Sequence, residues 1–348
     1  MAQRKRLDCR ASAPQIVALV TREQIVHPFE KALEVAEVEV ESLIFGFGDD
    51  GWLEFWLNPR RLRGSDFLMR WSQGQWSEER LIEAINTTDF FYALPYGPSS
   101  VAPDSSVREF ELYFERLEAA GAAGVKRPDL LIFRGADREF AQATVEKLGG
   151  VQELPFKRED EPLMKGLIAR SLLAVECENS LWRATKMPHF NTECTPQRRL
   201  GGKPGLKKGA VVPTVIIKEE DRQPLLAWQK DNETAIHVWQ VFFDRAYGLA
   251  LDEAERLVRD GLTEPIKQVF QAPGGPTTTK IIYKHCYRHA YPLGVSEADP
   301  TLTPDYIEDK NGHILPYVRF TGGRLQITPE ALTVLSNLAK ERERGEKR

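Results

Sequence analysis

Hydrophobic and polar positions alternate along the chain in patterns that predict strands and helices in turn. Short apolar runs indicate buried strands, at residues 130–133, 172–178, 211–218 and 224–228. Apolar residues at helical spacing predict helices, at residues 106–117, 137–148, 234–260 and from 327 onward. Because strands alternate with helices, the pattern favours an α/β fold.

A loop rich in proline, serine and glycine, at residues 94–106, interrupts this pattern and is a candidate subdomain boundary. The part before it contains a tryptophan-rich stretch, at residues 52–76, with the basic cluster Arg60, Arg61 and Arg63. The part after it holds all the strands and helices described above. We therefore expect an N-terminal subdomain of about 100 residues ahead of the α/β core.

The composition is that of an ordinary soluble protein, with 42% hydrophobic and 28% charged residues among 348. No apolar run approaches the ~20 residues that span a bilayer, and the basic N-terminus lacks the apolar core of a signal peptide, so we expect a cytoplasmic protein. The scattered cysteines favour neither a disulfide framework nor a cysteine-rich zinc site. The net charge of -4 means that nucleic acid binding would need locally concentrated positive charge. The cysteines are Cys9, Cys177, Cys194 and Cys286.

Glu176 and Glu178 end one of the predicted strands. Alternate side chains of a strand point the same way, so these two carboxylates share one face. The other face carries Leu173, Val175 and Cys177. Two like charges this close repel each other, and a divalent cation is the simplest compensation, since hard oxygen ligands suit Mg²⁺. A face that is only solvated is the plain alternative.

Pro128 and Asp129 stand directly before another apolar strand. A Pro-Asp pair, a strand, and an acid-x-acid pair on a later strand form an order that resembles the PD-(D/E)XK nuclease superfamily. The resemblance is to the variant in which glutamate replaces the usual lysine, as in some type II restriction endonucleases. It covers roughly residues 106–218 and implies a mixed central β-sheet flanked by helices, with additional N- and C-terminal elements.

The resemblance also implies roles for single residues. Asp129 would bridge the metal and the scissile phosphate, and Glu176 would be the second ligand of a Mg²⁺ ion. Glu178 stands where the family usually has lysine and would orient or deprotonate the attacking water. Three further residues are candidates for auxiliary roles: Glu111, Glu115 and Lys186.

Positive charge is concentrated just after the acid pair. Residues 183–208 contain a single acid, Glu193, among many basic side chains, and their glycines and prolines favour a loop. Such a segment is suited to contact DNA phosphates, although a solvated charged loop is the simpler alternative. The basic residues are Arg183, Lys186, Arg198, Arg199, Lys203, Lys207 and Lys208.

Residues 277–291 form a second candidate for DNA contact, in a strand outside the core. Period-two spacing would place its tyrosines and histidines on one face and Lys280, Lys284 and Arg288 on the other. A strand with donors on both faces is able to read base edges or follow phosphates. A half-buried aromatic strand is the alternative.

We therefore expect a type II restriction endonuclease that uses Mg²⁺ to hydrolyse double-stranded DNA and leaves 5′-phosphate ends. The resemblance implies a homodimer on a palindromic site and a companion DNA methyltransferase in the host. Residues 1–100 would serve recognition or dimerisation, 101–265 would form the nuclease core, and 266–348 would supply a DNA-contact strand and a terminal helix. A repair or mobile-element nuclease of the same superfamily, a DNA-binding protein without catalysis, and a hydrolase of small phosphoesters remain as alternatives.

Overall fold

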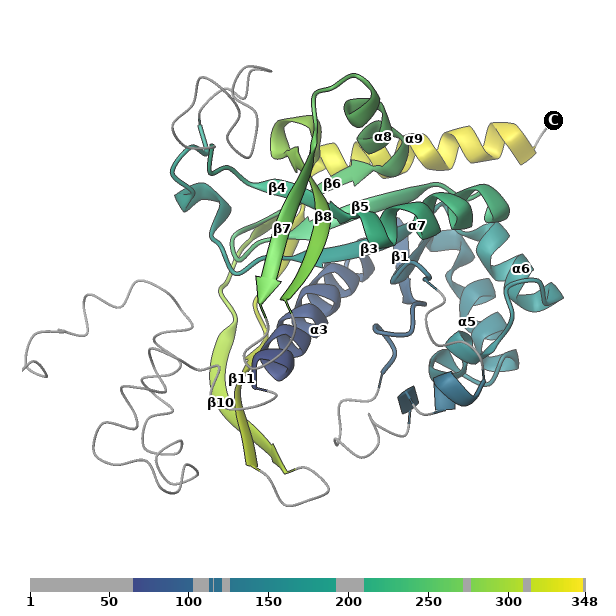
Figure 1. Cartoon of the computed structure of the whole chain (residues 1–348). Coiled ribbons are helices and arrows are strands. Elements are labelled where there is room, and N and C mark those ends of the chain that lie inside the picture. The colour runs from purple at the N-terminus through teal and green to yellow at the C-terminus, as the bar shows by residue number, and fades with distance from the viewer. Residues whose placement is uncertain are drawn as a thin grey trace, which may run out of the picture.

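The centre of the protein is a mixed β-sheet, seen in a computed structural model (Figure 1). The structure describes residues 65–102, 113–114, 116–120, 126–191, 210–271, 277–308 and 314–346. Within them the central sheet has seven strands in the order β1-β2-β3-β5-β6-β9-β12. Only β3 and β5 run parallel, and every other neighbouring pair is antiparallel. The bounds are Phe91–Pro95, Leu130–Arg134, Leu173–Asn179, Ile236–Val241, Arg245–Ala250, Tyr291–Ser296 and Leu325–Ile327.

Helices cover both faces of this sheet, so the expected α/β class with a mixed, helix-flanked sheet is confirmed. One face packs against α5 (Arg138–Lys147), α6 (Pro162–Arg170), α7 (Glu219–Asn232) and α8 (Leu251–Arg259). The other face packs against α3 (Ser65–Asn86) and α9 (Pro329–Glu346). Short 3₁₀ turns occur at Gly135–Asp137, Val151–Phe156, Ala184–Lys186 and Tyr287–His289.

Strand β2 shows why the sequence reads as a continuous apolar run. Leu131 and Phe133 belong to the core under α5 and α6, whereas Leu130 and Ile132 belong to the core under α3. All four side chains are fully buried. A strand covered on both faces has no polar face to show, and its period-two alternation disappears.

Two expectations for the C-terminal half are wrong. The run at residues 224–228 is helical, because Leu225 and Trp228 bury at helical spacing inside α7. The helix expected over 234–260 is a β5–β6 hairpin followed by α8. All six residues of β5 are buried, so the apolar positions there carry no periodicity that distinguishes a strand from a buried helix.

The other expected elements are present, with shifted ends. Strands β2, β3 and β4 (Thr214–Lys218) and helices α5 and α9 lie where the pattern placed them. Strand β4 belongs to a smaller sheet, in which it pairs with β8. Its Val215 and Ile217 side chains pack in the same core cluster as α5, α6, α7 and α8. Gly149 and Gly150 follow α5 with positive φ angles, as expected of a helix stop. Of the helix expected at 106–117, residues 113–114 and 116–119 are helical, and its start lies outside the described residues.

The strand expected at 277–291 is shorter than predicted. Strand β8 (Thr277–Cys286) pairs with β4 and with β7 (Pro265–Gln271) in a separate three-stranded sheet. A 3₁₀ turn follows, and Tyr291 opens β9 of the central sheet. The expected single face of tyrosines and histidines is therefore wrong, since the chain changes sheets within it.

A second ribbon, β10 (Thr301–Glu308) with β11 (Ile314–Thr321), projects from the body next to α3 (Figure 1). Trp76 of α3 donates its indole N–H to the Gly322 carbonyl at 2.6 Å and packs on the Phe320 ring. The central sheet takes β1 from the first 100 residues and β9 and β12 from the last 83, so it continues across both expected domain boundaries. Residues 1–64 lie outside the described part, and none of the described helices is long and apolar enough to cross a bilayer.

Glu233 ends α7 in the left-handed conformation, with φ of 51°. A side chain with a β-carbon is strained there by ~1–2 kcal/mol, and glycine is not. We expect Glu233→Gly to raise the free energy of unfolding by about 0.5–1 kcal/mol in urea titrations, after the loss of chain entropy is deducted. Glu233→Ala, which keeps the β-carbon, should give no such gain, and equal stabilities of the two variants would contradict this assignment.

Candidate metal centre

Glu176 and Glu178 lie at the carboxyl end of β3, in the middle of the central sheet. Leu173 and Val175 point into the core under α3, whereas Ala174 points to the opposite face. The two glutamates continue the Ala174 face, so the expectation that they share one face is confirmed. Pairing with β5 continues past both residues, which holds them on a rigid interior strand.

Asp221 joins these two glutamates from α7. One carboxylate oxygen of each residue lies within 4.8 Å of the other two, so the three form a compact acidic group. Helix α7 starts immediately after β4 and carries acids in its first turn, where the helix dipole favours negative charge. That preference explains an acid at this position but does not explain why its carboxylate faces two others.

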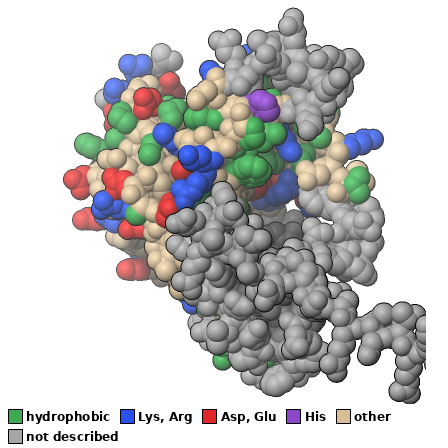
Figure 2. Space-filling view, turned by 90° about the vertical axis from the view of Figure 1, so that its left-hand side faces the viewer, with side chains coloured by type: hydrophobic (Ala, Val, Ile, Leu, Met, Phe, Trp, Pro, Cys, Tyr) green, Lys and Arg blue, Asp and Glu red, His purple; other side chains and the backbone are tan. Residues whose placement is uncertain are grey.

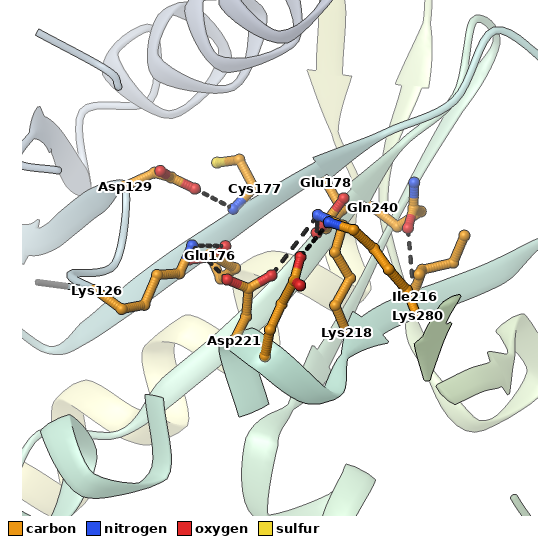
Figure 3. A network of polar contacts seen from close by, with 11 residues as sticks. Lys126, Asp129, Glu176, Cys177, Glu178, Ile216, Lys218, Asp221, Gln240 and Lys280 are labelled. Atoms are coloured by element: carbon orange, nitrogen blue, oxygen red, sulfur yellow. Dashed lines mark hydrogen bonds and ion pairs between the residues drawn. The ribbon is translucent and has the colours of Figure 1, made fainter. Parts of the chain in front are cut away.

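Two lysines lie between the carboxylates (Figure 3). Lys126 donates to Glu176 and lies 3.7 Å from an Asp221 oxygen. Lys218, the last residue of β4, lies 2.8 Å from Glu178 and 3.7 Å from the other Asp221 oxygen. The acidic group is therefore matched by positive charge from two separate segments of the chain.

Glu176 has one carboxylate oxygen without a hydrogen-bond partner among the described residues. Its side chain is only 7% exposed; Oε1 accepts from Lys126, and no donor within the described part of the chain reaches the buried Oε2. An unpaired buried acceptor costs roughly 1–3 kcal/mol, more when it is charged. A cation bound by the group of three would supply the missing partner, so these residues fit a metal ion of the hard, oxygen-preferring kind.

The same burial perturbs proton binding. Desolvation, and next the negative charge of Asp129, raise the pKa of Glu176 well above its usual value, although Lys126 opposes them. Burial lowers the pKa of Lys126 by less than Glu176, Asp129 and Asp221 together raise it. Lys126 therefore stays protonated at neutral pH, and the charged form of Glu176 is disfavoured as long as no further cation lies beside it.

Asp129 lies next to the acidic group but is not one of its three members. Its backbone N–H donates to the Val175 carbonyl at 2.8 Å, and its Oδ2 accepts from the Cys177 backbone N–H at 2.7 Å. The pairing of β2 with β3 ends at Leu130 and Val175. Beyond this pair, the Asp129 side chain takes the place of a backbone acceptor for the Cys177 N–H. This explains the Pro-Asp pair in part: Asp129 secures the strand that presents the two glutamates.

The backbone around Asp129 is held tightly on its other side. Tyr96 and Gly97 both donate their N–H groups to the Asp129 carbonyl, at 2.8 and 2.9 Å. A β-carbon on Gly97 would lie 2.7 Å from the Pro128 carbonyl oxygen, so no larger residue fits this approach. Arg127 points inward and donates to the carbonyls of Leu154 and Lys157, at 3.0 and 2.7 Å. These contacts leave Lys126 and Asp129 on either side of Arg127 to face the acids.

Glu78 of α3 is a further acid near Asp129, on the other face of the sheet. Burial, and next the charge of Asp129, raise the pKa of Glu78 well above its usual value. The auxiliary acids expected on the helix that precedes Asp129, Glu111 and Glu115, lie outside the described residues. Lys186 is exposed in the turn after β3, and the ammonium that contacts Glu178 is that of Lys218.

Four of the basic residues expected to bind DNA are described. Arg183 pairs with Asp299 at 2.6 Å and Arg288 stacks on Tyr287, whereas Lys186 is exposed and Lys284 is half-buried in β8. Figure 2 shows lysine and arginine side chains beside hydrophobic ones near the middle of one face, with acids at its left-hand edge. The remaining five lie outside the described residues: Arg198, Arg199, Lys203, Lys207 and Lys208.

Sequence reasoning missed Asp221, Lys126 and Lys218. The signal for Asp221 was available, as one of three acids that open a helix, but the helix itself was assigned as a strand. Lys218 ends a β-branched strand, and no residue near it in the sequence indicates that its ammonium contacts Glu178. Comparison of the chain with protein-family models, with curated proteins and with solved structures finds no match in any of the three.

The raised pKa of Glu176 makes stability depend on pH. Between the unfolded pKa of about 4.5 and the higher folded pKa, the folded state binds more protons than the unfolded state, so stability falls as pH rises through that window. Glu176→Gln should flatten this fall and raise the melting temperature at pH 7 in the presence of a chelator. A melting temperature lowered at pH 7 and unchanged in its pH dependence would contradict the assignment.

Divalent metal should raise the melting temperature of the wild type above that of Glu176→Gln. Mg²⁺ or Mn²⁺ at a concentration ten times its dissociation constant stabilises the protein that binds it by about 1.4 kcal/mol. We expect the wild-type melting temperature to rise on metal addition and that of Glu176→Gln to stay constant, as measured by calorimetry. Equal shifts in the two proteins would show that metal binds elsewhere.

Proposed function

We propose that this protein is a Mg²⁺-dependent endonuclease that hydrolyses phosphodiester bonds in double-stranded DNA. The observation that carries the proposal is the unpaired, buried Glu176 oxygen in the group that also contains Glu178 and Asp221. Acids that converge on one point and flanking lysines suit a reaction in which negative charge develops on phosphate oxygens. The order of Asp129, Glu176 and Glu178 along the chain adds the resemblance to PD-(D/E)XK nucleases.

The proposed metal ligands are Glu176, Glu178 and Asp221. A bound Mg²⁺ would lower the pKa of its water and offset charge on the scissile phosphate. We also propose that Asp129 lies beside the scissile phosphate, in addition to accepting the hydrogen bond from the Cys177 backbone. Because that bond occupies Oδ2, only Oδ1 of Asp129 is left for such a contact.

Lys218 has a role in the proposed reaction that is separate from metal binding. The water oxygen forms a bond to phosphorus, the bond from phosphorus to the 3′ oxygen breaks, and that oxygen gains a proton from a solvent water. Glu178 orients the attacking water, whose proton leaves to solvent, and the Lys218 ammonium beside Glu178 stabilises charge on the phosphate. Burial lowers the pKa of Lys218 by less than Glu178 and Asp221 together raise it, so Lys218 is protonated at neutral pH.

The narrower form of the proposal is a type II restriction endonuclease. It rests on the resemblance of Asp129, Glu176 and Glu178 to the glutamate variant of the family motif. The same resemblance supports a homodimer that matches a palindromic site and a companion methyltransferase that protects the host DNA. Incubation of phage DNA with Mg²⁺ and sequencing of the ends would show one recurring site with 5′-phosphates, whereas a repair enzyme would cut by DNA structure.

Substitution of the newly found ligand tests the metal centre. We expect Asp221→Asn to lower both metal affinity and DNA cleavage by at least about 100-fold, the upper cost of losing even an outer partner of a metal site. The matched control is Glu220→Gln, because Glu220 lies in the same turn but is 53% exposed and pairs with Lys280. Calorimetric titration with Mn²⁺ and plasmid cleavage report the two effects, and loss in both variants would contradict the assignment.

A second substitution separates metal binding from chemistry. Lys218→Met should reduce cleavage by about 10²–10³-fold, as loss of one charge-stabilising group does, and should leave Mn²⁺ bound at least as tightly. Lys186→Met, which changes an exposed lysine, should leave both unchanged. If Lys186→Met abolishes cleavage and Lys218→Met does not, the lysine expected from the sequence is the right one.

A further inference from the structure

A pocket of about 360 Å³ lies between α3 and residues 99–102. It is near the carboxyl end of β3, because a β-carbon on Gly74, which lines it, would lie 3.5 Å from the Asn179 side chain. Helix α3 covers the opposite face of the sheet from α7, so this pocket is separate from the acidic group. Asp129 accepts from the Cys177 backbone in the same strand, and its charge raises the pKa of Glu176 and of Glu78.

The walls of the pocket combine flat apolar surface with a few polar groups. Its apolar surface comes from Trp71, Ile82, Ala102 and Phe114, and its polar atoms come from Gln75, Glu78, Glu79, Ser99 and Ser100. A volume of this size falls in the range of small-molecule sites, roughly 300–1,000 Å³, which are mostly apolar with few directing polar groups. These features suit a planar ring that carries hydrogen-bonding groups on its edge.

Gly74 indicates that the hollow is maintained at a cost in stability. It lies inside the 22-residue helix α3, where glycine is less stable than alanine by ~1 kcal/mol. Its φ angle is not in the left-handed region, and a β-carbon would make only an ordinary contact, so the backbone does not require glycine. The missing side chain instead leaves space in the pocket.

We propose that this pocket receives one base of the DNA substrate, turned out of the double helix next to the scissile phosphate, and that the base carries an exocyclic amino group. Trp71 provides a face on which a base stacks, as aromatic side chains do for unpaired nucleotides. The Glu78 carboxyl accepts from an amino group, which adenine, cytosine and guanine have and thymine lacks. The inference rests on the proposed function, since it names the part of the substrate held beside that site.

The test fills the pocket with a larger side chain and leaves Glu176, Glu178 and Asp221 unchanged. The probes are fluorescent homopolymer oligonucleotides of deoxyadenosine, deoxycytidine and thymidine, titrated in chelator so that neither metal nor cleavage is involved. We expect Gly74→Leu to weaken all three probes about 5- to 150-fold, the value of stacking one base, and to weaken the adenine and cytosine probes most, because these also lose the contact with Glu78. Its control is Gly166→Leu, on an exposed position inside α6 with no neighbour within 4 Å.

Further measurements distinguish this proposal from a general loss of structure. Both leucine variants should melt at or above the wild-type temperature, and both should bind Mn²⁺ as the wild type does. Glu78→Gln should narrow the preference for adenine and cytosine over thymine, because an amide donates to the thymine carbonyl. A purely structural Glu78 would change all probes equally.

Several outcomes would overturn the inference. Equal binding of all probes by wild type and Gly74→Leu removes the pocket from nucleic acid binding. Free nucleoside monophosphates bound as tightly as the oligonucleotides would assign the pocket to a small ligand. Loss of Mn²⁺ binding in Gly74→Leu would make the hollow part of the metal centre. Failure of the proposed nuclease would appear differently, as absence of cleavage and of metal binding in the wild type.

Discussion

The hydrogen bond from the Cys177 backbone to the Asp129 carboxylate is the contact on which the centre of this molecule depends. The β2–β3 ladder ends one residue before Glu176, and an interior strand with an unpaired N–H would be destabilised there. Because Asp129 replaces the missing backbone acceptor, the Cys177 N–H stays satisfied while β3 continues beside β5 and presents Glu176 and Glu178 on one face.

The acidic group illustrates how a fold tolerates charges that it does not neutralise completely. Three carboxylates converge from β3 and α7, and two ammoniums, from Lys126 and Lys218, lie between them. Burying charges is stabilising only when every polar atom is satisfied, and the Glu176 oxygen is not. Conflict of this kind, left on a rigid strand, is typical of sites that are completed by a ligand.

The two faces of the sheet beside this site carry different kinds of side chain. Under α7, charged side chains converge on one point, which suits phosphate chemistry. Under α3, Gly74 and the apolar wall keep a hollow that costs helix stability, which suits recognition of a flat group. The charge of Asp129 raises the pKa of one acid on each face, Glu176 on one side and Glu78 on the other.

The sequence by itself determined the local features: the α/β class, strands β2 and β3, helices α5 and α9, and the shared face of Glu176 and Glu178. Each of these follows from side-chain periodicity over a few neighbouring residues. Only the tertiary structure decided that β5 is a strand, because a segment buried on all sides has no period to read. Only the tertiary structure shows that Asp221, Lys126 and Lys218 lie beside the glutamates. These contacts join residues 40 or more positions apart, and the spacing of neighbouring residues does not indicate them.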